Sequence, residues 1–223
     1  MNYGRPLKKA KEPFKFYTRL HLNELTGIKA SNIDELVDGL KTVPDAVIYY
    51  HTHHFIEEHH YLVPEPANDF SVWTGDALDD TVLSEKLAGI DTYEFTNINA
   101  LRMRIIAVIE EYISTKPVLH NAYPGREFHF IKSVGLVMPT AYSAYDLREF
   151  VEILRKISLD SLYFHMFESR LRLGKGINDF SIWLKDNLDE NDIANSISHL
   201  DPYNYTLSGL RSAVIQLIEK RIK

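Results

Sequence analysis

One short segment of this 223-residue chain holds five of its ten histidines. Apolar spacing predicts a helix from about Asp45 to Leu62 across this segment. On such a helix His51, His54 and Glu58 share the core-facing side, at spacings i, i+3 and i+7. Imidazole and carboxylate groups placed in this way build metal sites inside helical bundles. The sequence therefore indicates a candidate metal site at His51, His54 and Glu58.

Zinc, iron or manganese would suit such a site, because its ligands are nitrogen and oxygen and the chain has no cysteine. Further ligands would have to come from other elements, and the sequence does not rank the candidates His21, His120, His129, Glu65 and Asp69. The resulting hypothesis is a metal-dependent enzyme of hydrolase type, with Glu65 as an acid–base group.

The alternative is that His51 is a core histidine bonded to a polar neighbour. His53, Glu57 and His60 fall on the opposite side of the predicted helix, where such residues form modest surface pairs.

The elements that would position these residues occur twice. Asn68-Asp69-Phe70-Ser71-Val72-Trp73 reappears as Asn178-Asp179-Phe180-Ser181-Ile182-Trp183, and Tyr49-Tyr50-His51 as Tyr163-Phe164-His165. Roughly 27 of about 93 aligned positions are identical, at an offset of about 114 early in each copy and about 110 later, which indicates a tandem duplication.

The second copy argues against a metal site of the same type. It keeps His165, but it has Glu168 in place of His54 and Arg172 in place of Glu58. An arginine at this position would repel a cation, which favours a structural role for the shared histidine.

The shared Asn-Asp-Phe-Ser-x-Trp motif also admits a structural and a functional reading. Its aspartates lie where helix caps are expected, and its tryptophans are large apolar anchors. The functional reading is a ligand pocket lined by His51, His54, Glu58, Glu65, Asn68, Asp69 and Trp73.

Both copies have the same predicted local structure. Short alternating stretches at Phe14–Tyr17 and Phe128–Ile131 indicate brief strands that could pair with each other. Asn32 and Asp146 precede apolar residues at helical spacing, as capping residues do. We expect a mainly α fold with two homologous helical units related by pseudo-twofold symmetry, a basic flexible arm at 1–13, copy one at 14–113, a linker at 114–127 and copy two at 128–223.

Bulk composition excludes several classes of protein. A hydrophobic content of 45% suits a folded core, and a net charge of −6 argues against a nucleic-acid binder. The basic arm and the Thr-Gly-Ile-Lys-Ala turn are the features that would favour nucleic-acid binding, and they do not outweigh the acidic net charge. No apolar run is long enough to span a membrane and no signal peptide is evident, so we expect a soluble cytoplasmic protein.

One run of residues points to a family. His-His-Tyr-Leu-Val-Pro-Glu-Pro-Ala-Asn-Asp-Phe, residues 59–70, with Thr-Gly-Ile-Lys-Ala at 26–30, resembles a family of prokaryotic proteins catalogued only as a domain of unknown function. The resemblance covers most of the chain and implies no activity or catalytic residues.

No catalytic signature such as a nucleophile elbow or a phosphate loop is present. The first hypothesis is therefore a binding or regulatory protein, with a cleft between the two units for a small molecule or a protein partner. The alternative is the metal-dependent enzyme described above.

Overall fold

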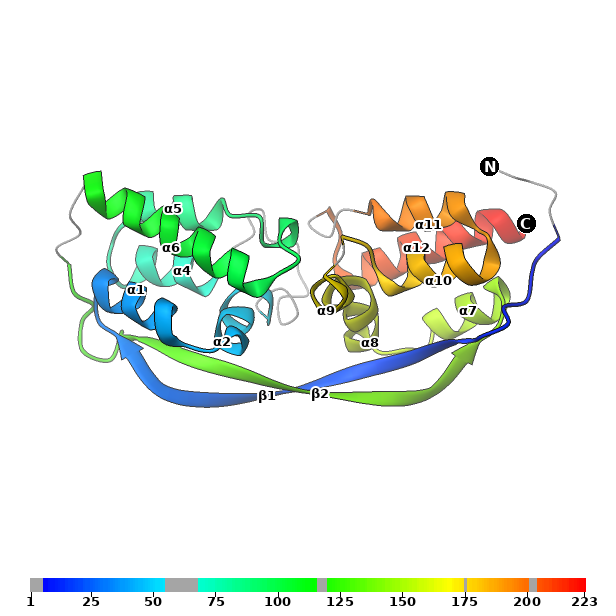
Figure 1. The fold of residues 1–223 in the computed structure, drawn as a ribbon, viewed down its shortest axis with the longest axis horizontal. Coiled ribbons are helices and arrows are strands. Elements are labelled where there is room, and N and C mark those ends of the chain that lie inside the picture. Colours follow the sequence, from blue (N-terminus) through cyan, green and yellow to red (C-terminus); the bar gives the residue numbers. More distant parts are fainter. Residues whose placement is uncertain (1–5, 55–67, 116–119, 175, 201–203) are drawn as a thin grey trace. The chain divides into compact units, whose positions relative to one another are not determined.

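The fold contains two long strands and two sets of helices. The computed structural model describes residues 6–54, 68–115, 120–174, 176–200 and 204–223 (Figure 1). The first half holds β1 (Phe14–Ala30), α1 (Ile33–Thr42), α2 (Asp45–Tyr49), the π-helix η1 (Tyr50–His54), α4 (Asp69–Asp76), α5 (Thr81–Ala88), η2 (Thr92–Glu94) and α6 (Ile98–Thr115). The second half holds β2 (Phe128–Ala144), α7 (Leu147–Leu154), α8 (Leu159–Tyr163), the π-helix η3 (Phe164–Glu168), α9 (Ser169–Leu173), α10 (Asp179–Leu188), α11 (Asn191–Ser198) and α12 (Leu207–Ile222).

The prediction of a mainly α fold is wrong, because the fold is mixed α/β. β1 and β2 are each 17 residues long and pair with each other in an antiparallel two-stranded sheet. Alternation of apolar and polar residues marked only the first four residues of each strand. The remaining residues carry apolar side chains on both faces, so that their pattern does not identify them as strand.

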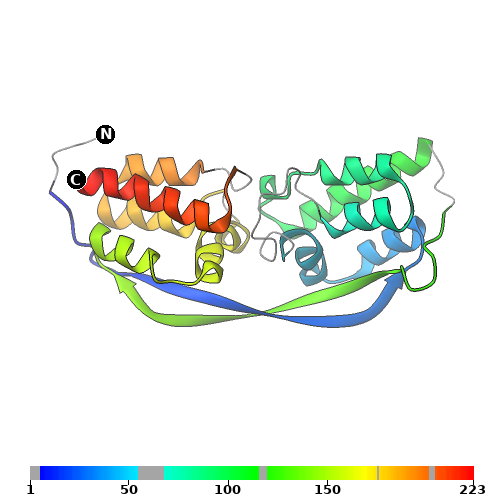
Figure 2. The same cartoon turned by 180° about the vertical axis from the view of Figure 1, so that it is seen from behind.

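Each strand is shared between two compact units. The α1–α6 unit holds the described residues of 21–59 and 63–135, so it contains the end of β1 and the start of β2. The α7–α12 unit holds the described residues of 6–20 and 136–223, with the start of β1 and the end of β2. Figures 1 and 2 show the helices of each unit on one face of its strand segments.

The start of each strand packs on the helices of the other copy. Phe128 and Phe130, from the second copy, belong to the core of the α1–α6 unit. Phe14, from the first copy, packs edge-on against Phe150 and Phe180 of the second. The two copies of the repeat have therefore exchanged their strands, and neither unit is built from one copy alone.

Local capping explains where several helices begin. The Asn32 side chain accepts from the Glu35 amide at 2.9 Å, and the Glu35 carboxylate accepts from the Ser31 amide at 2.7 Å. Asp146 and Glu149 repeat this arrangement before α7. These reciprocal bonds satisfy amides that have no partner within the helix, and both caps were predicted from the sequence.

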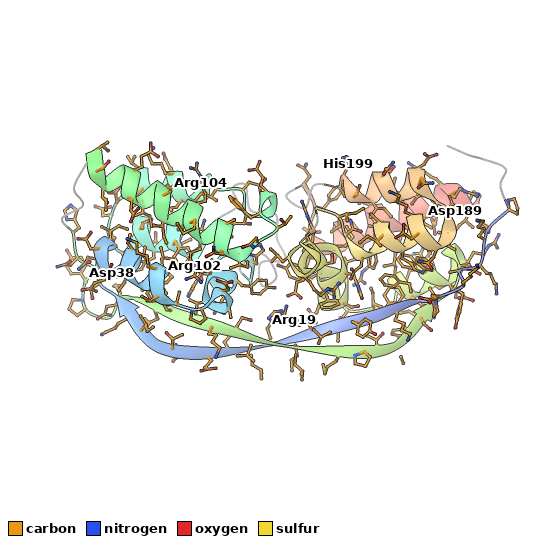
Figure 3. All side chains as sticks on the ribbon, viewed as in Figure 1. Arg19, Asp38, Arg102, Arg104, Asp189 and His199 are labelled. Atoms are coloured by element: carbon orange, nitrogen blue, oxygen red, sulfur yellow. The ribbon has the colours of Figure 1, made fainter. Side chains whose placement is uncertain are left out.

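Arginine side chains join helices within the units. The Arg102 guanidinium donates to the carbonyls of Leu40 and Val43 and pairs with Asp45 at 2.6 Å (Figure 3). Arg211, its counterpart, donates to the Ile157 carbonyl at 2.9 Å. Within the described part of the chain, no helix combines the length and the apolar character that crossing a membrane requires.

Candidate functional site

The histidine shared by both copies lies at the same structural position in each unit. His51 is in the π-helix η1 and His165 is in the π-helix η3, and both side chains are buried. A π-helix has more residues per turn than an α-helix, and such turns are frequent at functional sites. The wider turn shifts the helical phase of the residues in it and after it.

This shift makes part of the predicted helical wheel wrong. The predicted α-helix from Asp45 ends at Tyr49, where the π-helix begins. His53 was predicted on the outer side, but it is only 3% exposed and its ring stacks on Tyr49 at 5.4 Å. Glu57 and His60 lie outside the described residues.

Both ring nitrogens of His51 are engaged in hydrogen bonds. Nε2 accepts from the backbone N–H of Ile131 in β2 at 3.0 Å, and Nδ1 lies 2.7 Å from Oδ2 of Asp69. A backbone amide can only donate, so Nε2 carries no proton and Nδ1 donates to the carboxylate. His51 therefore joins the incoming strand to the helices of its unit.

His165 forms the same bonds in the α7–α12 unit. Its Nε2 accepts from the Tyr17 amide of β1 at 2.8 Å, and its Nδ1 lies 2.8 Å from Oδ2 of Asp179. Burial lowers the pKa of His165 below its ordinary value of 6.5, and the nearby cation of Arg172 lowers it further, while Asp179 opposes both. His165 is therefore held neutral, with its proton on Nδ1. We call the arrangement in each unit, His51–Asp69–Ile131 and His165–Asp179–Tyr17, a strand clamp.

Aromatic rings surround both strand clamps. The ring of Phe128 lies 4.6 Å from the His51 ring, and that of Phe14 lies 4.8 Å from the His165 ring. The indole N–H of Trp73 donates to the Arg126 carbonyl at 2.8 Å, and that of Trp183 donates to the Glu12 carbonyl at 3.1 Å. Each tryptophan thus holds the residues that lead into the strand.

A groove lies beside the strand clamp of the α7–α12 unit. Its volume is about 540 Å³, within the range of sites for small molecules. It is lined by residues of β1, by the two residues that precede β1 and by residues of the helices: Glu12, Pro13, Phe14, Lys15, Tyr17, His165, Arg172, Asp179 and Trp183.

Arg172 gives this groove a fixed cation. Its Nη2 lies 2.5 Å from Oδ2 of Asp179, and its guanidinium carbon lies 4.6 Å from the centre of the Phe164 ring. The side chain is still 43% exposed. An ion pair and a cation–π contact therefore hold the guanidinium in place while part of it faces solvent.

The structure brings together some of the residues predicted to bind a ligand. His51 and Asp69 form the strand clamp of the α1–α6 unit, and the rings of His51 and Trp73 both pack against Phe128. Asn68 has a structural role instead, because its side chain caps α4 through the Ser71 amide and donates to the Leu87 carbonyl. Glu58 and Glu65 lie outside the described residues, and nothing is said of the His54 side chain.

The metal at His51, His54 and Glu58 stays a prediction for the same reason. Among the described residues no group of three or more potential ligands gathers at one point. His51 would have to give up the Ile131 or the Asp69 hydrogen bond to bind a cation. Of the further candidates, His21 bonds to Ser133 at 2.8 Å, and His120 and His129 are exposed.

The interpretation of Asp69 and Asp179 as helix caps is wrong. Asn68 and Asn178 cap these helices, and the aspartates beside them accept from the clamp histidines. Sequence reasoning also missed Lys15 as a groove residue. The only available signal for the groove was that Arg172 replaces an acidic residue of the first copy.

A comparison with known protein families shows to which family the chain belongs. A model of a family of unknown function, DUF5752, matches residues 11–219. The chain belongs to that family. The family resemblance read from the sequence is therefore confirmed.

The DUF5752 fold also occurs in a solved structure. The chain is similar to OrfY from Thermoproteus tenax, with 30% sequence identity and a TM-score of 0.81, over 96% of this chain and 97% of that one. No curated protein matches the chain.

Proposed function

We propose that this DUF5752 protein is a binding protein whose α7–α12 unit takes a small organic anion in the groove beside the His165 strand clamp. The observation that carries the proposal is the Arg172 guanidinium, which is fixed by Asp179 and Phe164 and remains partly exposed in the groove. An arginine held in this way loses little side-chain entropy when it binds a carboxylate or phosphate.

The other groove residues narrow the class of ligand. Lys15 supplies a second cation, and Phe14, Pro13 and Trp183 supply apolar surface. Glu12 can accept a hydrogen bond but would repel a second anionic group. These groups suit a ligand that has one anionic head, an apolar body and a hydroxyl or amino donor.

Binding suits this groove better than acid–base catalysis through His165. A catalytic base needs a nitrogen within reach of a substrate proton. Nδ1 of His165 carries a proton that is directed to Asp179, and its Nε2 accepts from the Tyr17 amide. A ligand would instead contact strand residues and helix residues together, and so would stabilise the junction between them.

The two copies predict one anion site per chain. The first copy has Glu58 where the second has Arg172, and a carboxylate at that position would disfavour an anion. We therefore expect a stoichiometry of one.

The test uses the fluorescence of Trp183, which lines the groove. In a Trp73→Phe background, Trp183 is the only tryptophan of the chain. Titration with 4-hydroxybenzoate, with benzoate and inorganic phosphate as comparison probes, should change its emission with saturation. Arg172→Ala should weaken binding at least tenfold, since it removes a charge-assisted contact of about 1.5–3 kcal/mol.

Arg148→Ala is the matched control, because Arg148 is an exposed arginine of the same unit outside the groove. It should leave binding unchanged. The proposal fails if no probe changes Trp183 emission up to high millimolar concentration, or if Arg172→Ala binds as well as the parent.

A further inference from the structure

Charged groups of both signs line the groove of the α7–α12 unit. Arg172 and Lys15 are its cations, and Asp179 and Glu12 are its carboxylates. The formal charges of these four groups therefore sum to zero. A ligand with only an anionic head would disturb this balance, whereas a ligand with one charge of each sign keeps it.

Two of the four groups already neutralise each other. Oδ2 of Asp179 lies 2.5 Å from Nη2 of Arg172 and 2.8 Å from Nδ1 of His165, so this carboxylate is engaged by two donors. A guanidinium has five N–H donors, and the Arg172 side chain is 43% exposed. Arg172 can therefore bind the carboxylate of a ligand without releasing Asp179.

Glu12 and Lys15 have charges that no other described residue neutralises. Both residues are exposed, and among the described residues neither takes part in an ion pair. Lys15 adds to the attraction of the groove for a carboxylate. Glu12 is the carboxylate that can accept a hydrogen bond from an ammonium group, and such a charge-assisted bond is roughly twice as strong as one between neutral groups.

The backbone that carries Glu12 and Lys15 is held at two points. The indole N–H of Trp183 donates to the Glu12 carbonyl at 3.1 Å, and Nε2 of His165 accepts from the Tyr17 amide at 2.8 Å. Both of these anchoring side chains are buried. The segment from residue 12 to residue 17 is therefore positioned before a ligand arrives, which reduces the entropy lost on binding.

Aromatic rings give the same groove an apolar side. The Phe14 ring lies edge-on to the Trp183 indole at 5.7 Å and to the His165 ring at 4.8 Å. Pro13 and Tyr17 extend this surface. An apolar side chain of a ligand would be removed from water by contact with these rings.

We infer that the ligand of this groove is an amino acid with an apolar side chain. Its carboxylate binds Arg172, its ammonium group binds Glu12, and its side chain lies against Phe14 and Trp183. The inference rests on the proposed function of the α7–α12 unit, and it narrows the ligand from small organic anions in general to zwitterions.

Three probes with the same phenyl ring test the inference. L-phenylalanine has both charged groups, 3-phenylpropionate lacks the ammonium group, and phenethylamine lacks the carboxylate. Each probe is titrated into the full chain with Trp73→Phe, and Trp183 fluorescence reports binding, because none of the probes contains an indole. L-phenylalanine should bind at least about tenfold more tightly than either of the other two.

Glu12→Gln tests which group recognises the ammonium. It should weaken the binding of L-phenylalanine at least about tenfold and leave 3-phenylpropionate bound at least as tightly, whereas Arg172→Ala should weaken the binding of both. The hydrogen bond of Glu12 to Trp183 uses the backbone carbonyl, so Glu12→Gln should keep the fold. The matched control is Glu152→Gln, because Glu152 is an exposed glutamate of the same unit outside the groove. It should bind all three probes as the parent does.

The remaining outcomes distinguish a failure of the inference from a failure of the proposed function. If 3-phenylpropionate binds as tightly as L-phenylalanine, or if Glu12→Gln leaves the preference for L-phenylalanine unchanged, the zwitterion is wrong and the anion site stands. If phenethylamine binds most tightly, the groove takes a cation and both are wrong. Both are also wrong if none of the three probes changes Trp183 emission.

Discussion

The strand clamps of the two units have the same core and different surroundings. In both, a buried histidine accepts from a strand amide and donates to an aspartate. In the α7–α12 unit that aspartate also binds Arg172, and its side chain is 17% exposed. In the α1–α6 unit Asp69 is 33% exposed.

The shared part of the clamps explains why both copies keep His, Asp and Trp. These residues attach a strand that comes from the other copy, so the fold needs them in both units. The part that differs is the sequence position of Arg172, at which the first copy has Glu58. The two copies therefore share the clamp, and the second has in addition a cation at the groove of the α7–α12 unit.

The largest expected effect comes from separating the copies. A fragment of residues 6–115 has the helices of the α1–α6 unit but not Phe128 and Phe130, which complete its core. Phe14 and Phe16 of the same fragment match these residues in the repeat. The fragment should therefore unfold as a monomer or form a dimer that exchanges β1 strands.

Light scattering coupled to size exclusion, with circular dichroism, checks this outcome. Residues 120–223 should behave in the same way. Mixing the two fragments should restore a complex in which each fragment supplies its strand to the other. A folded, stable monomer of either fragment would show that strand exchange is dispensable.

The next effect distinguishes the two clamps. His165→Ala should lower the free energy of unfolding of its unit by about 3 kcal/mol or more, because it leaves a cavity and an unpaired strand amide. His51→Ala should do the same to the α1–α6 unit. Each unit contains one tryptophan, so urea unfolding in Trp73→Phe and Trp183→Phe backgrounds follows the units separately.

Each histidine substitution should move the tryptophan transition of its own unit and leave the other within about 0.5 kcal/mol. His129→Ala, an exposed histidine on β2, is the control and should move neither. Losses below about 1 kcal/mol from the clamp substitutions would mean that the aromatic packing alone holds the strands.

The smallest effect is on pH dependence. Burial lowers the pKa of His165, so the unfolded chain takes up the proton more readily than the folded one. The free energy of unfolding of the α7–α12 unit should therefore fall as the pH decreases through 6.5 and level off below the folded-state pKa. His165→Gln should remove this component, and the exposed His199→Gln should not.

Arg172→Glu tests the part of the second clamp that differs from the first, because it gives the second copy the acidic residue of the first. Removing the cation raises the pKa of His165 and so weakens the pH dependence. Urea unfolding followed by Trp183 fluorescence at pH 7.5 and pH 5.5 measures the pH dependence of the free energy of unfolding for both variants. If this free energy depended on pH as steeply in His165→Gln as in the parent chain, the pH dependence would belong to other groups.

Much of the local structure follows from the sequence alone. The duplication, the caps at Asn32 and Asp146 and the membership in the family could all be read from residue types and spacing. A capping side chain bonds an amide two or three residues away, so that its signal lies within one short window. The interpretation of the shared histidine as a core residue bonded to a polar neighbour also came from the repeat.

Only the tertiary structure decided which copy supplies each strand, and therefore what the histidines hold. Ile131 and His51 are 80 positions apart, and Tyr17 and His165 are 148 apart. The π-helices also changed the phase that a regular helix would give to His53. Strand pairing and clamp bonds form between residues that are brought together by burial of aromatic side chains. Because both copies carry the same phenylalanines, the sequence pattern suits a strand packed on its own helices and a strand exchanged between copies equally well.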